Sequence, residues 1–206
     1  MLAYVFWHRP RDSEDVAAYE SAVCAFHGSL ARSAPAGMIA SASYRDCELP
    51  WRTDADGDGA LRAPAYEDWY LVEDYAALGV LNEAAVGRGH RTRHSEAAQR
   101  YGAGAGGLYA LLEGEPCARA LGEATLAVWV SPARPRGSQE RRSELGELMG
   151  DGMEPASASL WRRQLVLGPA PEFCVLAREV PSGVGASRLP AGWRASVLER
   201  EVMWSS

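Results

Sequence analysis

Residues 2–37 read LAYVFWHRPRDSEDVAAYESAVCAFHGSLARSAPAG, and this stretch decides the fold. Residues 2–7 are a short apolar run rich in aromatic residues, which is typical of a buried strand. Asp12 or Ser13 then offers a helix N-cap, with Asp15 in the first turn. From Ser13 to about Ala34 the apolar residues recur at steps of three and four, which gathers them on one helical face: Val16, Tyr19, Val23, Phe26 and Leu30. The residues Pro-Ala-Gly at 35–37 end the helix, so the pattern is a strand followed by a helix.

The same alternation continues to residue 113. Met38 to Arg45 and Tyr66 to Glu73 are predicted strands, and the Gly- and Asp-rich segment between them is predicted to be irregular. A helix is expected to begin near Asp74, because Ala77, Leu78, Leu81 and Ala85 share one face. Leu108 to Glu113 would be the fourth strand. The order β-α-β-β-α-β is that of the split βαβ, or ferredoxin-like, unit.

The second half repeats this pattern more loosely. The segment 125–132 matches residues 4–10 in placing Trp two residues before a polar residue and then Pro, and 138–149 is a predicted amphipathic helix. Ala-Ser-Ala-Ser occurs at 40–43 and again at 156–159, each time entering a predicted strand. Residues 180–191 contain two Pro and two Gly, so the second helix of this half is expected to be reduced or missing. We therefore predict an α+β protein with two ferredoxin-like repeats, residues 1–118 and 119–206.

Two ferredoxin-like units that pair their sheets resemble the dimeric α/β-barrel superfamily, here in a fused two-repeat form. That superfamily includes antibiotic-biosynthesis monooxygenases, EthD-like proteins, muconolactone isomerases and proteins of the chlorite dismutase type. The resemblance covers nearly the whole chain and rests on the order of its elements. It implies a small apolar cavity in each unit, between sheet and helices or inside the barrel, in a monomer or homodimer. It implies no particular reaction, because this fold carries several chemistries.

Composition excludes several classes of function. The formal charge of −6 and the lack of a basic stripe argue against a nucleic-acid partner. All 21 basic residues are Arg, as in high-GC bacterial genomes, and without Lys there is no Schiff-base nucleophile and no Lys-bearing phosphate loop. The first ten residues lack a signal-peptide pattern and no apolar run is long enough for a membrane span. With four widely spaced Cys, we expect a cytoplasmic protein with reduced thiols.

His27, Glu20 and His8 are the candidate catalytic residues. His27 falls within the apolar face of the first predicted helix, and Glu20, seven residues earlier, has nearly the same azimuth. A His oriented by a carboxylate in an apolar pocket suits a general base for an acidic C–H or phenol. His8, at the end of the first strand, would complete such a pocket. The competing interpretation is that both histidines are structural.

Aromatic residues of the predicted strands are the candidate substrate-binding residues. Flat aromatic walls suit an apolar aromatic ligand, although the same residues equally suit a core. By strand alternation, Trp69 and Tyr70 face opposite sides, so at most one of them lines a given cavity. The predicted substrate contacts are Trp7, Tyr44, Arg45 and Trp69.

Three weaker motifs are interpreted as structural, and no metal site or cofactor is predicted. His90 and His94 have the spacing of a helical metal pair but lack an evident third ligand. Asp54, Asp56 and Asp58 open like a calcium loop, but Ala65 stands where its bidentate Glu belongs. The glycines at 102, 104 and 107 spell G-x-G-x-x-G but precede a strand, where no helix N-terminus would bind phosphate.

The leading functional hypothesis is an enzyme of the cofactor-independent oxygenase, isomerase or cyclase type. Its substrate would be a small apolar compound, aromatic or polyketide-like, bound in the first half. Two alternatives remain open at this point: a non-catalytic module that binds a metabolite or protein, and a haem or metal protein that uses the histidines.

Overall fold

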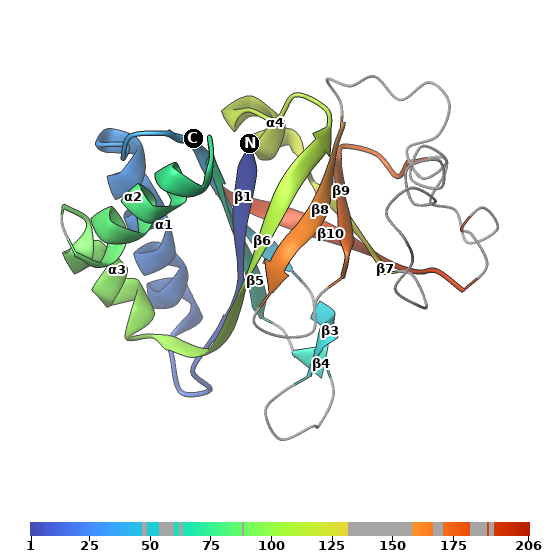
Figure 1. Ribbon diagram of the computed structural model, residues 1–206. Coiled ribbons are helices and arrows are strands. Elements are labelled where there is room, and N and C mark those ends of the chain that lie inside the picture. Colours follow the sequence, from blue (N-terminus) through green and yellow to red (C-terminus); the bar gives the residue numbers. More distant parts are fainter. Residues whose placement is uncertain are drawn as a thin grey trace.

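The computed structural model describes residues 1–46, 49–53, 60–61, 64–87, 89–131, 158–166, 171–181, 189 and 192–206 (Figure 1). The elements follow one another along the chain as β1 (Leu2–Pro10), α1 (Val16–Arg32), β2 (Met38–Asp46), β3 (Leu49–Thr53), β4 (Ala60–Leu61), β5 (Ala65–Val72), α2 (Tyr75–Val86), α3 (Arg91–Ala98), β6 (Tyr101–Glu113), α4 (Ala118–Glu123), β7 (Leu126–Ser131), β8 (Ala158–Val166), β9 (Phe173–Ala177) and β10 (Arg194–Ser205).

Eight strands close into an antiparallel barrel in the order β1-β5-β2-β10-β7-β9-β8-β6, and β3 and β4 form a separate two-stranded sheet. Within the barrel the strands of the first half run β6-β1-β5-β2, and those of the second half run β10-β7-β9-β8. When the barrel strands of each half are numbered along the chain, both runs have the same strand order, 4-1-3-2. The halves meet where β2 pairs with β10 and where β6 pairs with β8. The α+β class is confirmed, and the duplication of the sequence stays a prediction.

The helices of the first half lie on one side of the barrel. Figure 1 shows α1, α2 and α3 together against the strands β1 and β5, with α4 at one end of the barrel. The predicted helix at 138–149 lies outside the described residues. Within the part of the chain that the structure describes, no helix lies between β9 and β10. None of the described helices combines the length and apolarity needed to cross a membrane.

Local signals place some boundaries differently from the sequence prediction. Asp15, rather than Asp12 or Ser13, caps α1, because its Oδ1 accepts a hydrogen bond of 2.7 Å from the backbone N of Ala18. The helix α3 was not predicted, since it buries only Ala97 and therefore lacks apolar periodicity. The segment expected to be irregular contains the short strands β3 and β4.

The barrel interior is an aromatic core. Six large side chains in it have at most 1% of their surface exposed: Trp7, Trp69, Trp129, Trp161, Tyr44 and Tyr109. Their rings meet mostly edge to face, with centroids 5.4 Å apart for Trp7 and Trp129 and 5.5 Å apart for Trp69 and Trp161. Such edge contacts add to the burial of large apolar area.

One ion pair crosses this core. The Glu67 side chain, fully buried, accepts hydrogen bonds from the indole N–H of Trp7 at 2.9 Å and of Trp69 at 2.6 Å. Arg200, from the last strand of the barrel, donates to the same carboxylate at 2.6 Å and to the backbone O of Ala124 at 2.6 Å. Its guanidinium also lies 3.8 Å from the centre of the Tyr44 ring. The interaction therefore ties the second half of the barrel to the first.

Replacing Arg200 by Met should destabilise the protein by about 3–5 kcal/mol, because the Glu67 carboxylate would stay buried without its counter-charge. Urea unfolding at pH 7 measures this loss. The double variant Glu67→Gln with Arg200→Met should recover much of it, since no uncompensated charge remains. Equal stabilities of the single and double variants would contradict this account.

Asp46, at the end of β2, provides a pH-dependent prediction. It is 3% exposed, and neither carboxylate oxygen has a hydrogen-bond partner among the described residues. Burial and the charge of Glu67 raise its pKa well above the usual range, against the effect of Arg200. The native state therefore favours the protonated acid. Below the pKa of about 3.9 that Asp46 has in the unfolded chain, both states are protonated and Asp46 does not lower the free energy of unfolding. As the pH rises above that value, ionisation favours the unfolded chain and the free energy of unfolding falls. The variant Asp46→Asn should be more stable than the wild type at pH 7, and the difference in unfolding free energy should vanish near pH 3.5. A difference that does not change with pH would overturn this assignment.

Candidate functional site

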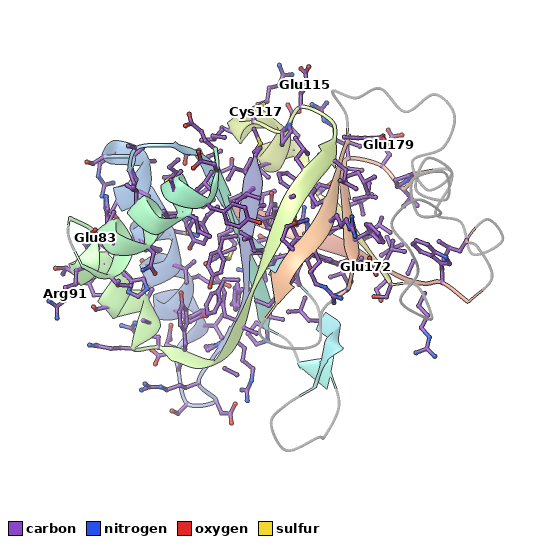
Figure 2. The ribbon with its side chains drawn as sticks, viewed as in Figure 1. Glu83, Arg91, Glu115, Cys117, Glu172 and Glu179 are labelled. Atoms are coloured by element: carbon purple, nitrogen blue, oxygen red, sulfur yellow. The ribbon has the colours of Figure 1, made fainter. Side chains whose placement is uncertain are left out.

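A cavity of about 560 Å³ lies between the outer face of the first half-sheet and the three helices that cover it. Its size is within the range of ligand pockets. Figure 2 places Glu83 and Arg91 at the outer edge of this helical layer, away from the sheet. Among the described residues, no Asp, Glu or Arg side chain belongs to the lining, which is formed by Tyr4, Phe6, Phe26, Tyr70, Tyr75, Leu78, Gly79, Leu81, Asn82, Ala85, Val86, His94 and Tyr101.

Two glycines on β6, which have no side chain, leave room for the aromatic residues that form the floor of this cavity. A Cβ on Gly104 would lie 2.5 Å from the Cζ of Phe6, and a Cβ on Gly106 would overlap the hydroxyl of Tyr4. The rings of Phe6 and Tyr4 therefore lie across the backbone of β6. Phe6 also contacts Tyr101, with ring centroids 5.3 Å apart. The Gly-rich segment, which has the sequence pattern of a phosphate loop, therefore leaves space for two aromatic rings against the backbone of β6.

Behind the floor lies a fully buried charged network. Asp68, on β5, has its Oδ2 3.1 Å from His8 Nε2 and 3.4 Å from His27 Nε2, and all three side chains have no exposed surface. His8 Nδ1 forms a hydrogen bond with the Tyr19 hydroxyl, and His27 Nδ1 lies 2.9 Å from the hydroxyl oxygen of Ser41. Each histidine is therefore held from both sides of its ring.

Tyr70 connects this network to the cavity. Its hydroxyl oxygen lies 3.2 Å from His27 Nε2 and donates to Asp68 Oδ2 at 3.2 Å, while its ring stacks on His27 with centroids 4.9 Å apart. Because Tyr70 lines the cavity and His8 and His27 do not, a bound molecule would touch the network through Tyr70.

The electrostatics of the network follow from burial and from the single carboxylate. Burial by itself would raise the pKa of Asp68, but His8 and His27 hold the pKa of that carboxyl well below its usual range. Burial and the nearby Asp68 charge raise the pKa of Tyr70 well above that of an exposed phenol. Tyr70 is therefore a protonated hydrogen-bond donor at neutral pH.

The predicted pairing of Glu20 with His27 is wrong. Glu20 instead accepts hydrogen bonds from Arg45, at 2.8 and 2.7 Å, and from Tyr66 at 2.8 Å. Seven residues of helix are about 10 Å along the axis, so an equal azimuth does not bring two side chains together. Asp68 takes the place expected for Glu20, and Arg45 is occupied by Glu20 and by Glu201 at 2.6 Å.

The predicted substrate contacts Trp7, Tyr44 and Trp69 are not brought to the cavity. All three lie inside the barrel with no exposed surface, on the other face of the sheet from Tyr70. The alternation of Trp69 and Tyr70 is confirmed, but the residue that lines the cavity is Tyr70. The core interpretation of the aromatic strand residues therefore holds for these three.

The two histidines of the HRTRH segment have separate surroundings. His90 is 7% exposed and contacts Ser29 Oγ at 3.1 Å and the backbone O of Ser33 at 3.0 Å, which fastens the start of α3 to the end of α1. His94 lines the cavity. The described residues include no group of three or more His, Cys, Asp or Glu side chains placed to hold a metal ion. Asp54, Asp56 and Asp58 lie outside the described residues.

Sequence reasoning missed Asp68 and Tyr70, the centre of the site. The available signal was alternation along β5: Tyr66, Asp68 and Tyr70 are two residues apart and share the face toward the helices. On this face of the strand, a carboxylate lies between two tyrosines. The helix packed on the same face carries a buried His, and the two features together would have indicated this network.

No family model matches the sequence, and a search of curated proteins finds no match. Among solved structures, a "putative monooxygenase" from Lactobacillus acidophilus NCFM superimposes with a TM-score of 0.57 at 8% identity, over 100% of this chain and 98% of that chain. An "anthrone oxidase-like protein" superimposes with a TM-score of 0.55 at 10% identity, over 99% and 92%. A "putative chlorite dismutase" gives a TM-score of 0.47 at 12% identity, over 98% and 95%.

The first two likenesses, at such low identity, concern the fold. Together with the closed antiparallel barrel and its layer of helices, they show that the chain has the dimeric α/β-barrel fold. The resemblance predicted from the order of elements is confirmed at this level.

The variant Gly104→Ala should narrow the cavity and destabilise the protein by about 1–3 kcal/mol, because the new methyl group forces the Phe6 ring away from β6. Urea unfolding measures the stability, and fluorescence titration with 2-naphthol measures the binding of an aromatic probe. Gly79→Ala is the control for stability, because its Cβ would meet nothing within 4 Å and alanine favours the helix α2 by about 1 kcal/mol. Thr92→Ala, at an exposed position of α3 outside the cavity lining, is the control for probe binding. If Gly104→Ala binds the probe as the wild type does, Phe6 is not held in this way.

Proposed function

We propose that this protein is a small-molecule enzyme that acts on an uncharged aromatic compound in the helix-side cavity, without a cofactor. Tyr70 would contact the substrate, and His27, Asp68 and His8 would set its proton affinity and position. The single observation that carries the proposal is that Tyr70 lines the cavity while its hydroxyl lies 3.2 Å from the imidazole of His27 and from Asp68.

The absence of charged side chains from the described lining supports an uncharged substrate. A buried charge without a partner is costly, so a carboxylate or ammonium group on the ligand would find no compensation there. Aromatic rings on several walls supply flat contact surface instead. This is the composition of a site for a ring compound with a few polar groups at its edge.

The expected chemistry is proton transfer. Oxygenase, isomerase and cyclase reactions of activated ring compounds each need a proton moved at a C–H or O–H group. Tyr70 is protonated at neutral pH, so it would take a proton from the substrate by passing its own hydroxyl proton to the imidazole of His27, 3.2 Å away, in the same step. His27 keeps the role predicted for it only through Tyr70, because its own ring does not line the cavity.

The arrangement of the barrel supports a fused form of the fold. Two four-stranded runs with the same strand order meet at two seams within one chain. The barrel therefore closes without a second copy, and we propose that residues 1–118 and 119–206 are two repeats of a pseudo-dimer. The second repeat would act as the partner sheet of the first.

Anthrone is a suitable probe substrate, because one structural neighbour is described as anthrone oxidase-like and because deprotonation at its acidic carbon starts its oxidation. The wild type should accelerate oxygen consumption by anthrone. Tyr70→Phe should lower kcat by about 10²-fold or more, the usual range for loss of a proton-transferring group. Tyr4→Phe removes another hydroxyl from the same cavity and should change kcat little.

Three outcomes of this experiment differ in meaning. Equal losses in both variants would contradict the special role of Tyr70. A kcat of Tyr70→Phe close to that of the wild type would contradict the acid–base assignment. Tight binding of anthrone without turnover by the wild type would favour a non-catalytic binding protein, for which the complete burial of His8, His27 and Asp68 already offers support.

A further inference from the structure

We propose that His94 anchors the polar edge of the ligand, by accepting a hydrogen bond from a hydroxyl group on an aromatic ring that fills the helix-side cavity. This inference rests on the cavity described above and adds to the proposed function a specificity for hydroxylated ring compounds. It concerns a residue of α3, separate from the Tyr70 network on the sheet.

His94 differs from the other histidines of the chain. His8, His27 and His90 each have both ring nitrogens within reach of protein groups: Tyr19 and Asp68, Ser41 and Tyr70, and Ser29 and Ser33. Neither ring nitrogen of His94 has a hydrogen-bond partner among the described residues; its one ring contact is an edge-to-face packing on Phe26, with centroids 5.3 Å apart. Its hydrogen-bonding capacity is therefore free for a ligand.

The position of His94 is fixed. Its backbone N donates to the O of His90 at 2.9 Å, and His90 is itself fastened to the C-terminal end of α1. Phe26, on α1, contacts His94 on one side and Tyr70 at 6.3 Å between ring centroids. A ring compound that packs on Phe26 would thus have polar groups of the protein near two of its edges.

The protonation state of His94 suits an acceptor. Partial burial lowers its pKa below the usual value of imidazole, and no charged group contributes to this shift. A neutral imidazole has one nitrogen that donates and one that accepts. A phenolic or alcoholic hydroxyl is a complementary partner, whereas a ligand without such a group leaves the acceptor unsatisfied.

Two ligands of the same skeleton, naphthalene and 2-naphthol, test this inference by fluorescence titration at pH 7.5. The wild type should bind 2-naphthol about fivefold more tightly than naphthalene, the factor that one net hydrogen bond supplies. His94→Leu should lose this preference and keep the dissociation constant of naphthalene within about twofold. His94→Gln, which retains a polar side-chain end, should restore part of the preference. Thr92→Leu, at an exposed position of α3 outside the cavity lining, should keep all of it.

Each other result is decisive. A preference that survives in His94→Leu, or that the wild type never shows, overturns the role of His94 while leaving the cavity and the Tyr70 assignment intact. If the wild type binds neither ligand, the cavity itself is not a ring-binding site, and the proposed function fails together with this inference. Thermal unfolding monitored by circular dichroism confirms that each variant is folded.

Discussion

The closure of the barrel depends on how a buried negative charge is neutralised. Glu67 lies on β5 with no access to water, and among the residues that the structure describes only Arg200 brings a full positive charge to it. The two indole N–H groups complete the coordination of the carboxylate and thereby orient Trp7 and Trp69. Since an unpaired charge in such a core costs several kcal/mol, the second half of the barrel must bring Arg200 into place. The aromatic packing around it follows from that constraint.

Neighbouring residues of β5 serve the core on one face of the sheet and the candidate site on the other face. Glu67 and Trp69 point into the barrel, while Asp68 and Tyr70 point toward the helices. Two buried carboxylates one residue apart thus serve different purposes because a strand alternates its side chains. A slip of one residue in the register would exchange them, so the ionic core also fixes the site.

Most of the first-half fold could be predicted, because strand and helix periodicities there are strong. Apolar spacing placed α1 and turned His27 toward the sheet, where it is buried. The helix α3 escaped prediction because its sequence is polar almost throughout. The partner of His27 was not predicted, because contacts between a helix and a strand depend on the register of the strand. Asp68 lies 41 residues away in the sequence, whereas the local candidate Glu20 is two helical turns from His27. The aromatic strand residues suit either a ligand site or a core by sequence, and the structure uses Trp7, Tyr44 and Trp69 as core.

The seams of the barrel have a consequence for synthesis on the ribosome. The strands β2 and β6 are the edges of the first half, and their partners β10 and β8 are translated later. Until then, the nascent chain presents two unpaired edges and an uncompensated Glu67. Unpaired edges invite association with other chains, and pairings so distant in sequence form slowly. The first half is thus expected to need shielding, by chaperones or by slow translation, until β10 has emerged.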